Sequence, residues 1–263
     1  MDPSLSVLLA FLPFALSHIG LGVPTVRSAL VERLGVWGFT WLFFAVAALT
    51  FALAISTYAG VQGTGSPGPA LGGVPVLREL LIGAVVLGIV LMTASLAEFG
   101  GSPYSISSAG VTEPTGLSRV TRHPFFVGVG LLGVGHALLA THLPATVAMG
   151  FLGVFALVGA HFQDRKLVVQ RGSTYAEYVR ATSFVPFAAI LAGRQLLVVR
   201  ELSVAGLGIG LGLAWGLRFA HAHVFDAGGA YVIGTTVGGA LLILATQGRQ
   251  MRRGSDVTVG TSS

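Results

Sequence analysis

Long apolar segments alternate with short polar segments along most of the chain. About 20 consecutive apolar residues are needed to cross the hydrocarbon core of a bilayer. Seven stretches approach this length, at about 4–24, 37–60, 79–100, 124–142, 144–163, 199–219 and 228–247. The pattern predicts an all-α, polytopic transmembrane helical bundle of about seven helices.

The segments between these stretches carry signals of their own. Residues 61–75 are rich in Gly and Pro and predict a loop. Residues 172–178 predict a short amphipathic helix, which Tyr175 and Tyr178 would anchor at the membrane interface. Residues 182–190 are apolar but too short to span, which predicts an interfacial or re-entrant segment.

Composition supports a membrane protein. Hydrophobic residues make up 53% of the chain and charged residues 10%, whereas about a quarter of the residues in a soluble domain are charged. The absence of cysteine excludes disulfides and thiolate ligands. The net charge of +5 comes from basic residues in short loops between apolar stretches. This placement indicates the lipid bilayer as partner and argues against nucleic acid.

The basic residues also predict an orientation. Of the 15 Lys and Arg residues, all but Arg78 and Arg218 fall on one side of a seven-helix arrangement. Because cytoplasmic loops carry an excess of Lys and Arg, we expect the N-terminus outside and the C-terminus inside. The expected location is a prokaryotic cytoplasmic membrane.

Histidines are the candidate chemical groups, because ionisable residues at membrane depth are rare and usually functional. This topology places His18, His123 and His161 near the inner helix ends, together with Glu98. His136 follows His123 by 13 residues, about 20 Å along a helix, and so belongs to the outer half. Three arginines accompany the inner group: Arg27, Arg119 and Arg122.

Several roles are open for these histidines. Neutral imidazole binds iron, copper and zinc, so two histidines from separate helices would suit a haem and three would suit zinc. Arginines at the interface would then pair with the haem propionates. The structural alternatives are that His123 simply begins a helix at Pro124 and that His18 is a buried hydrogen-bonding residue.

Ordered motifs across residues 14–225 resemble the NnrU family of membrane proteins. They include His18-Ile19-Gly20-Leu21 with Arg27, and a G-x-x-R-x-T-R-H-P-x-x-x-G run from Gly116 to Gly128. Gly135-His136, residues 182–195 and the late segment 219–223 continue the resemblance. Within this family the chain is most similar to the carotenoid isomerases.

The resemblance implies an integral membrane haem b protein that isomerises a polyene of the 15-cis-ζ-carotene type. It implies His18 and His123 as iron ligands and catalytic residues. The expected cofactor-binding residues are Arg27, Arg119, Arg122 and His136. The expected domains are a family-like haem-binding domain at 1–225, an added transmembrane helix at 226–250 and a disordered tail at 251–263.

Two other functions fit the same resemblance. One is a haem-binding accessory or sensor protein of nitric oxide or denitrification metabolism. The other is a membrane methyltransferase related to the isoprenylcysteine carboxyl methyltransferases, which share an R-H-P segment and a later G-x-x-Y-x-x-Y. Those enzymes carry paired glutamates where this chain has His161 to Lys166, so methyl transfer is the weaker prediction. The oligomeric state is left open.

Overall fold

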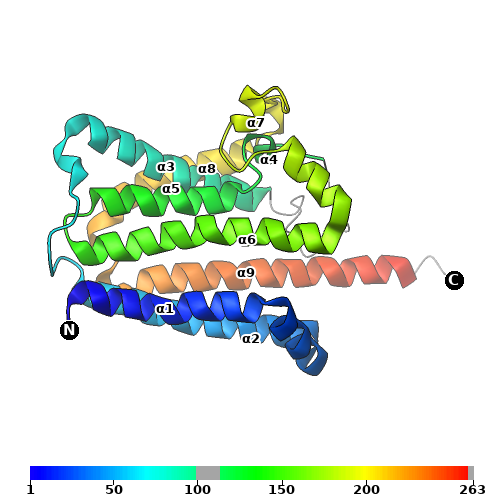
Figure 1. Cartoon of the computed structure of the whole chain (residues 1–263), viewed down its shortest axis with the longest axis horizontal. Coiled ribbons are helices and arrows are strands. Elements are labelled where there is room, and N and C mark those ends of the chain that lie inside the picture. Colours follow the sequence, from blue (N-terminus) through cyan, green and yellow to red (C-terminus); the bar gives the residue numbers. More distant parts are fainter. Residues whose placement is uncertain (99–112, 260–263) are drawn as a thin grey trace. The chain divides into compact units, whose positions relative to one another are not determined.

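The computed structural model describes residues 1–98 and 113–259 (Figure 1). Within these ranges the regular secondary structure is helical, apart from one isolated bridge between Pro67 and His142. The helices of four residues or more are α1 (Pro3–Gly22), α2 (Pro24–Val61), α3 (Pro75–Ala97), α4 (Leu117–Val120), α5 (Pro124–Leu139), α6 (Leu143–Ala181), α7 (Ala188–Leu191), α8 (Val204–Ala220) and α9 (Asp226–Val259). Three short 3-10 helices complete the set: η1 (Leu71–Gly73), η3 (Val199–Glu201) and η4 (His221–His223).

The all-α membrane class is confirmed. Among the described residues, α1, α2, α3 and α6 are long and apolar enough to cross a membrane, and α5 is a shorter apolar helix. Each of the seven expected spans coincides with a helix, although residues 99–100 of the third lie outside the described residues. Spanning by α5, α8 and α9 stays a prediction, as does the orientation.

Local signals explain where the long helices begin and bend. Asp2 caps α1 by accepting hydrogen bonds from the backbone N–H groups of Ser4 and Leu5, and Pro3 follows at the first helical turn. Gly35, at φ +70°, interrupts α2, so the long apolar segment begins after it and matches the expected span at 37–60. Gly172 interrupts α6 in the same way. α9 continues to Val259, past the expected start of the tail, and residues 260–263 lie outside the described residues.

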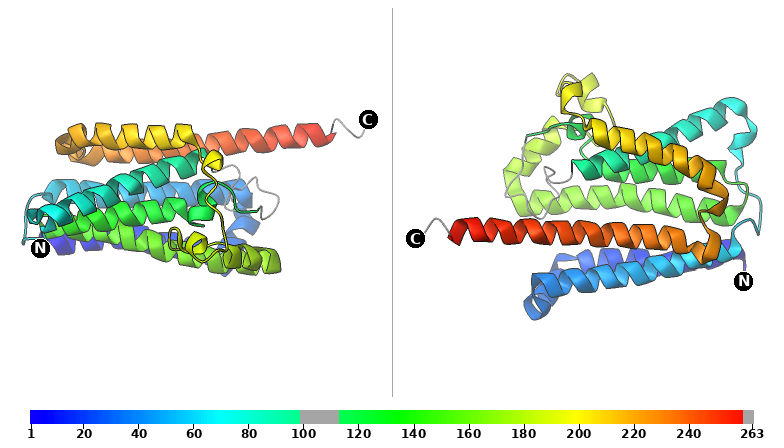
Figure 2. Two further views of the ribbon diagram at one scale, coloured as in Figure 1. Left: turned by 90° about the horizontal axis from the view of Figure 1, so that it is seen from above. Right: turned by 180° about the vertical axis from the view of Figure 1, so that it is seen from behind.

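The chain forms two compact units. The first comprises Met1–Leu81, Gly133–Leu152 and Ala220–Gly238, and the second comprises Ile82–Leu132, Gly153–Phe219 and Gly239–Ser263. In unit 1, α1 and α2 run antiparallel side by side (Figure 2). Its core is made of Val7, Phe11, Ala54, Ile55, Tyr58 and Ala148.

The predicted loop at 61–75 is confirmed, and backbone hydrogen bonds hold it against another segment of unit 1. Gly68 N–H donates to the carbonyl oxygen of Thr141 at 2.9 Å, and Leu143 N–H donates to that of Ser66 at 2.8 Å. These bonds satisfy backbone groups on both segments and also define the turn between α5 and α6.

Glycines allow the helices of unit 2 to approach closely. A Cβ added at Gly88 of α3 would lie 2.6 Å from the carbonyl oxygen of Gly128 on α5, so the two backbones are in contact there. Gly206 and Gly210 of α8 lie equally close to the backbone of α3 at Ala94 and Val90. Close packing through small residues is the expected mode in membrane bundles.

Candidate functional site

The Arg119–His123 segment is joined to residues 182–187 by backbone hydrogen bonds. α4 ends at Val120 and Thr121 turns to extended backbone. Arg122 N–H then donates to the carbonyl oxygen of Ser183 at 2.9 Å, and Phe187 N–H donates to that of Val120 at 2.8 Å. The hydroxyl of Thr121 donates to the carbonyl oxygen of Phe184 at 2.8 Å. The segment predicted to be interfacial or re-entrant therefore holds the R-H-P turn in place.

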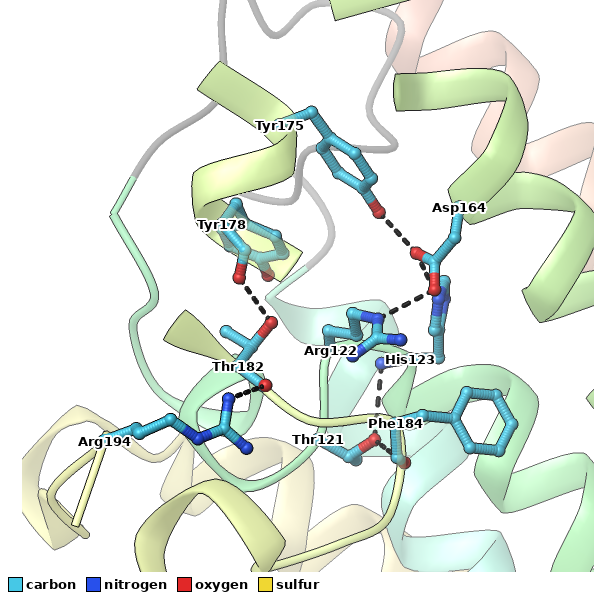
Figure 3. A network of polar contacts seen from close by, with 9 residues as sticks. All are labelled: Thr121, Arg122, His123, Asp164, Tyr175, Tyr178, Thr182, Phe184 and Arg194. Atoms are coloured by element: carbon cyan, nitrogen blue, oxygen red, sulfur yellow. Dashed lines mark hydrogen bonds and ion pairs between the residues drawn. The ribbon is translucent and has the colours of Figure 1, made fainter. Parts of the chain in front are cut away.

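The carboxylate of Asp164 organises the side chains beneath this turn (Figure 3). Its Oδ1 lies 2.8 Å from Nε2 of His123 and accepts a hydrogen bond from the hydroxyl of Tyr175 at 2.7 Å. Its Oδ2 accepts a hydrogen bond from Nε of Arg122 at 2.8 Å. We call these four residues, His123, Asp164, Arg122 and Tyr175, the Asp164 hub.

Burial makes the hub a strong constraint on His123. The side chain of His123 has no exposed area, and those of Asp164 and Arg122 are 12% and 14% exposed. An ionised carboxylate only accepts hydrogen bonds, so Nε2 of His123 carries the proton in this arrangement. The single charges of Arg122 and Asp164 then balance, which is the condition for burying them.

The expectation that Tyr175 and Tyr178 anchor a helix at the membrane interface is wrong. Both tyrosines are buried, their rings stack at 5.6 Å, and the hydroxyl of Tyr175 is bonded to Asp164. Gly172, at φ +61°, bends α6 and lets residues 173–181 turn this face inward. A spacing of three residues puts two side chains on one face but does not say what that face meets.

Arg119 and Glu98 tie α4 to the segment that precedes α8. Nε of Arg119 donates to Glu201 at 2.7 Å, and its Nη1 donates to the side-chain oxygen of Gln195 at 2.9 Å. The hydrogen bond between Arg119 and Glu201 raises the pKa of Arg119 and lowers the pKa of Glu201. Glu98 accepts hydrogen bonds from the N–H groups of Leu117 and Ser203. Glu98, expected among the inner candidate groups, thus acts as a backbone cap.

His18 and His136 belong to unit 1, whereas the residues of the Asp164 hub belong to unit 2. Nδ1–H of His18 donates to the carbonyl oxygen of Phe14 at 3.2 Å, one turn earlier in α1. The His18 ring contacts the rings of Phe14 and Phe43, at centroid distances of 4.3 and 4.9 Å. The His136 and His221 rings lie 5.9 Å apart.

The sequence profile of the NnrU protein family matches residues 6–228. The chain belongs to the NnrU protein family. It is 30% identical over 206 residues to the 15-cis-zeta-carotene isomerase, chloroplastic, of Arabidopsis thaliana, covering 74% of this chain and 53% of that protein. It is 39% identical over 83 residues to the Zea mays protein of the same name, covering 32% of this chain and 23% of that protein.

The chain therefore spans about half the length of the Arabidopsis relative. No solved structure gives a significant match. Both plant relatives carry the word chloroplastic in their names, so they give no support to the expected prokaryotic membrane. Membership in the NnrU family, expected from the ordered motifs, is confirmed.

The two histidines expected to bind haem iron differ in how well they fit that role. In His18, the bond from Nδ1 to the backbone leaves Nε2 as the ligating nitrogen, an arrangement typical of metal-bound histidines. In His123, Nε2 is bonded to Asp164, and a bond from one ring nitrogen to a carboxylate is equally typical of metal-bound histidines, but this ring is fully buried. The described residues contain no cluster of three or more His, Cys, Asp or Glu that could hold a metal ion.

The three arginines expected to pair with propionates differ too. Arg119 and Arg122 are bonded to Glu201 and Asp164, so protein carboxylates occupy the place expected for propionates. The guanidinium of Arg27 lies 5.3 Å from the centre of the Phe39 ring. Pairing of Arg27 with a propionate stays a prediction.

Sequence reasoning missed Asp164 and Tyr175 as partners of His123. The sequence places Asp164 in the loop after an apolar stretch and predicts Tyr175 at the membrane interface, and neither position points to His123. One signal was available, because Asp164 is an acidic residue at the end of an apolar stretch. A charge in that position needs a buried partner unless it reaches water.

Proposed function

We propose that this membrane protein catalyses cis–trans isomerisation of a carotenoid polyene of the 15-cis-ζ-carotene type. The similarity over 206 residues to a plant protein of that name carries the proposal. A carotenoid is apolar and dissolves in the bilayer, so it would reach the protein sideways from lipid. The apolar side chains exposed on α1, α2 and α8 are compatible with such an approach.

The proposed cofactor is haem b, which the family resemblance implies. Each expected ligand has one ring nitrogen hydrogen-bonded, His18 to the backbone and His123 to Asp164, which is how metal-bound histidines are oriented. When bound, a reduced haem would supply electron density that weakens a double bond toward rotation.

Isomerase activity is tested by pigment analysis of whole cells. A strain that accumulates the 15-cis precursor is analysed with and without the full chain, and the carotenoid isomers are separated by chromatography. The expected result is conversion of the 15-cis isomer only where the chain is present. Unchanged isomers, with the protein found intact in the membrane, would favour the accessory or sensor role in nitric oxide metabolism.

Haem binding is tested by absorbance spectroscopy of the purified chain, expressed with adequate haem supply. We expect a Soret band that is lost in His18→Ala, because this substitution removes a ligand. We expect the band to be lost or weakened in His123→Ala as well, because His123 is the other expected ligand. His161→Ala is the matched control, since His161 is exposed. A wild-type protein without a Soret band would contradict the cofactor proposal. The isomerase proposal would then depend on the pigment analysis alone.

A further inference from the structure

A continuous row of π groups runs along the paired helices α1 and α2. His18 contacts Phe14 on its own helix and Phe43 on α2. From these two rings the row extends in both directions, to Phe51 beside Phe14 at 5.8 Å and to Phe39 beside Phe43 at 6.1 Å. The guanidinium of Arg27 lies over the Phe39 ring and forms one end of the row. We call this set the aromatic row, in the order Arg27, Phe39, Phe43, His18, Phe14 and Phe51.

The aromatic row borders the hydrophobic core of unit 1, against which Phe51 packs. The core residues, such as Val7, Phe11 and Ile55, are almost wholly buried. In the row, Phe39 is buried but Phe14, His18, Phe43 and Phe51 are only partly buried. Side chains next to it on α1 are open, since Leu16 is 66% and Ile19 50% exposed. The row is therefore partly accessible at the surface of unit 1 through its own side chains.

The linear order of the row sets the shape of a suitable ligand. Phe39 and Phe51 are 12 residues apart on α2, which is about 18 Å along the helix axis. The ring contacts follow one another in this order along the two helices, so the aromatic groups form a row and not a compact cluster. An extended chain of conjugated double bonds presents a π face of this form, whereas a haem is a disc.

We propose that the aromatic row binds the conjugated segment of the polyene. This inference rests on the proposed function and adds to it the residues that hold the substrate. Aromatic rings stack favourably against flat π systems beyond the gain from apolar burial. The row would thus retain a conjugated polyene in preference to the saturated lipid chains around it, and it would bring His18 beside the double bonds.

The test is a binding titration on the full chain in detergent, read by quenching of tryptophan emission. Trp37 and Trp41 lie on α2, close in sequence to Phe39 and Phe43, and can transfer energy to a bound polyene. The probe is a ζ-carotene isomer, added at a fixed ratio of detergent to protein. The variants are Phe14→Leu and Phe43→Leu, which keep an apolar side chain but remove the π face. The matched control is Phe225→Leu, which removes a ring that contacts Tyr58 in unit 1 outside the row.

We expect saturable quenching in the wild type and in the control, with affinity weakened roughly two- to tenfold in each row variant. The Soret absorbance and thermal unfolding of the same samples separate loss of cofactor or of folding from loss of polyene binding. Row variants that bind like the control, or a wild type without saturable quenching, would overturn the proposal. Binding by the row without isomer conversion would instead contradict the proposed function and leave the binding site standing.

Discussion

At the scale of single residues, the Asp164 carboxylate holds three side chains from two segments of unit 2. His123 and Arg122 come from the turn before α5, and Tyr175 comes from the bent end of α6. The arrangement gives the R-H-P motif a structural role that does not depend on a cofactor. Arg122 and His123 are constrained in it because each satisfies a different oxygen of one buried carboxylate.

We predict that Asp164→Asn destabilises the folded chain by about 3–5 kcal/mol, because it leaves Arg122 buried without its counter-charge. The measurement is unfolding of the full-length protein in mixed micelles. Glu177→Gln is the matched control, since the Glu177–Arg180 pair is 3.9 Å apart and both side chains are 70% exposed or more. Equal free energies of unfolding for the two variants would contradict a stabilising role of the Asp164 hub.

At the scale of helices, glycine positions decide which faces meet. α8 carries Gly206 and Gly208 two residues apart, and so on different faces. A Cβ at Gly206 would lie 2.8 Å from Cα of Ala94 on α3, whereas nothing lies within 4 Å of the equivalent position at Gly208. One face of α8 is thus packed against α3, and the opposite face is open for lipid.

The two glycines give a paired prediction. Gly206→Ala should destabilise the protein by about 1–3 kcal/mol, because the added methyl group forces the α3 and α8 backbones apart. Gly208→Ala should be neutral or stabilising by up to about 1 kcal/mol, because alanine favours the helix and meets no neighbour. Thermal unfolding of the two variants provides the comparison. Equal effects would mean that α8 does not pack on α3 through Gly206.

At the scale of the whole molecule, the chain is a helical membrane protein of the NnrU family, built from two compact units. Its expected orientation comes from the distribution of basic residues and can be measured directly. The natural sequence has no cysteine, so any introduced cysteine is the sole target of a thiol reagent. The loop after α2 and the bend in α6 are predicted to face opposite sides of the membrane.

We predict that Thr64→Cys reacts with a membrane-impermeant maleimide in intact cells, because its loop is expected outside. Ser173→Cys should react only after permeabilisation, because the basic segment around it is expected inside. Both positions are exposed, so burial would not block the reagent. The opposite labelling pattern would reverse the orientation, and labelling of both in intact cells would require an even number of spans between them and so contradict the three predicted.

Helix positions and family membership could be predicted from the sequence because they depend on local properties. The length of an apolar stretch measures what can cross a bilayer, and the Gly- and Pro-rich composition of residues 61–75 marks a loop. Ordered motifs around His18, His123 and His136 were sufficient to identify the family. None of these inferences required knowing which side chains meet.

The partners of His123 were decided only by the tertiary structure. Asp164 lies 41 residues from His123 along the chain, and Tyr175 a further 11, with a bend at Gly172 between them. A buried carboxylate must find donors, but the sequence does not specify which of several arginines, histidines and tyrosines will be close enough. The same holds for His18, since the ring of Phe43 reaches it only because α2 folds back along α1. Sequence alone determined what each segment is, whereas the folded chain determined which polar groups satisfy one another.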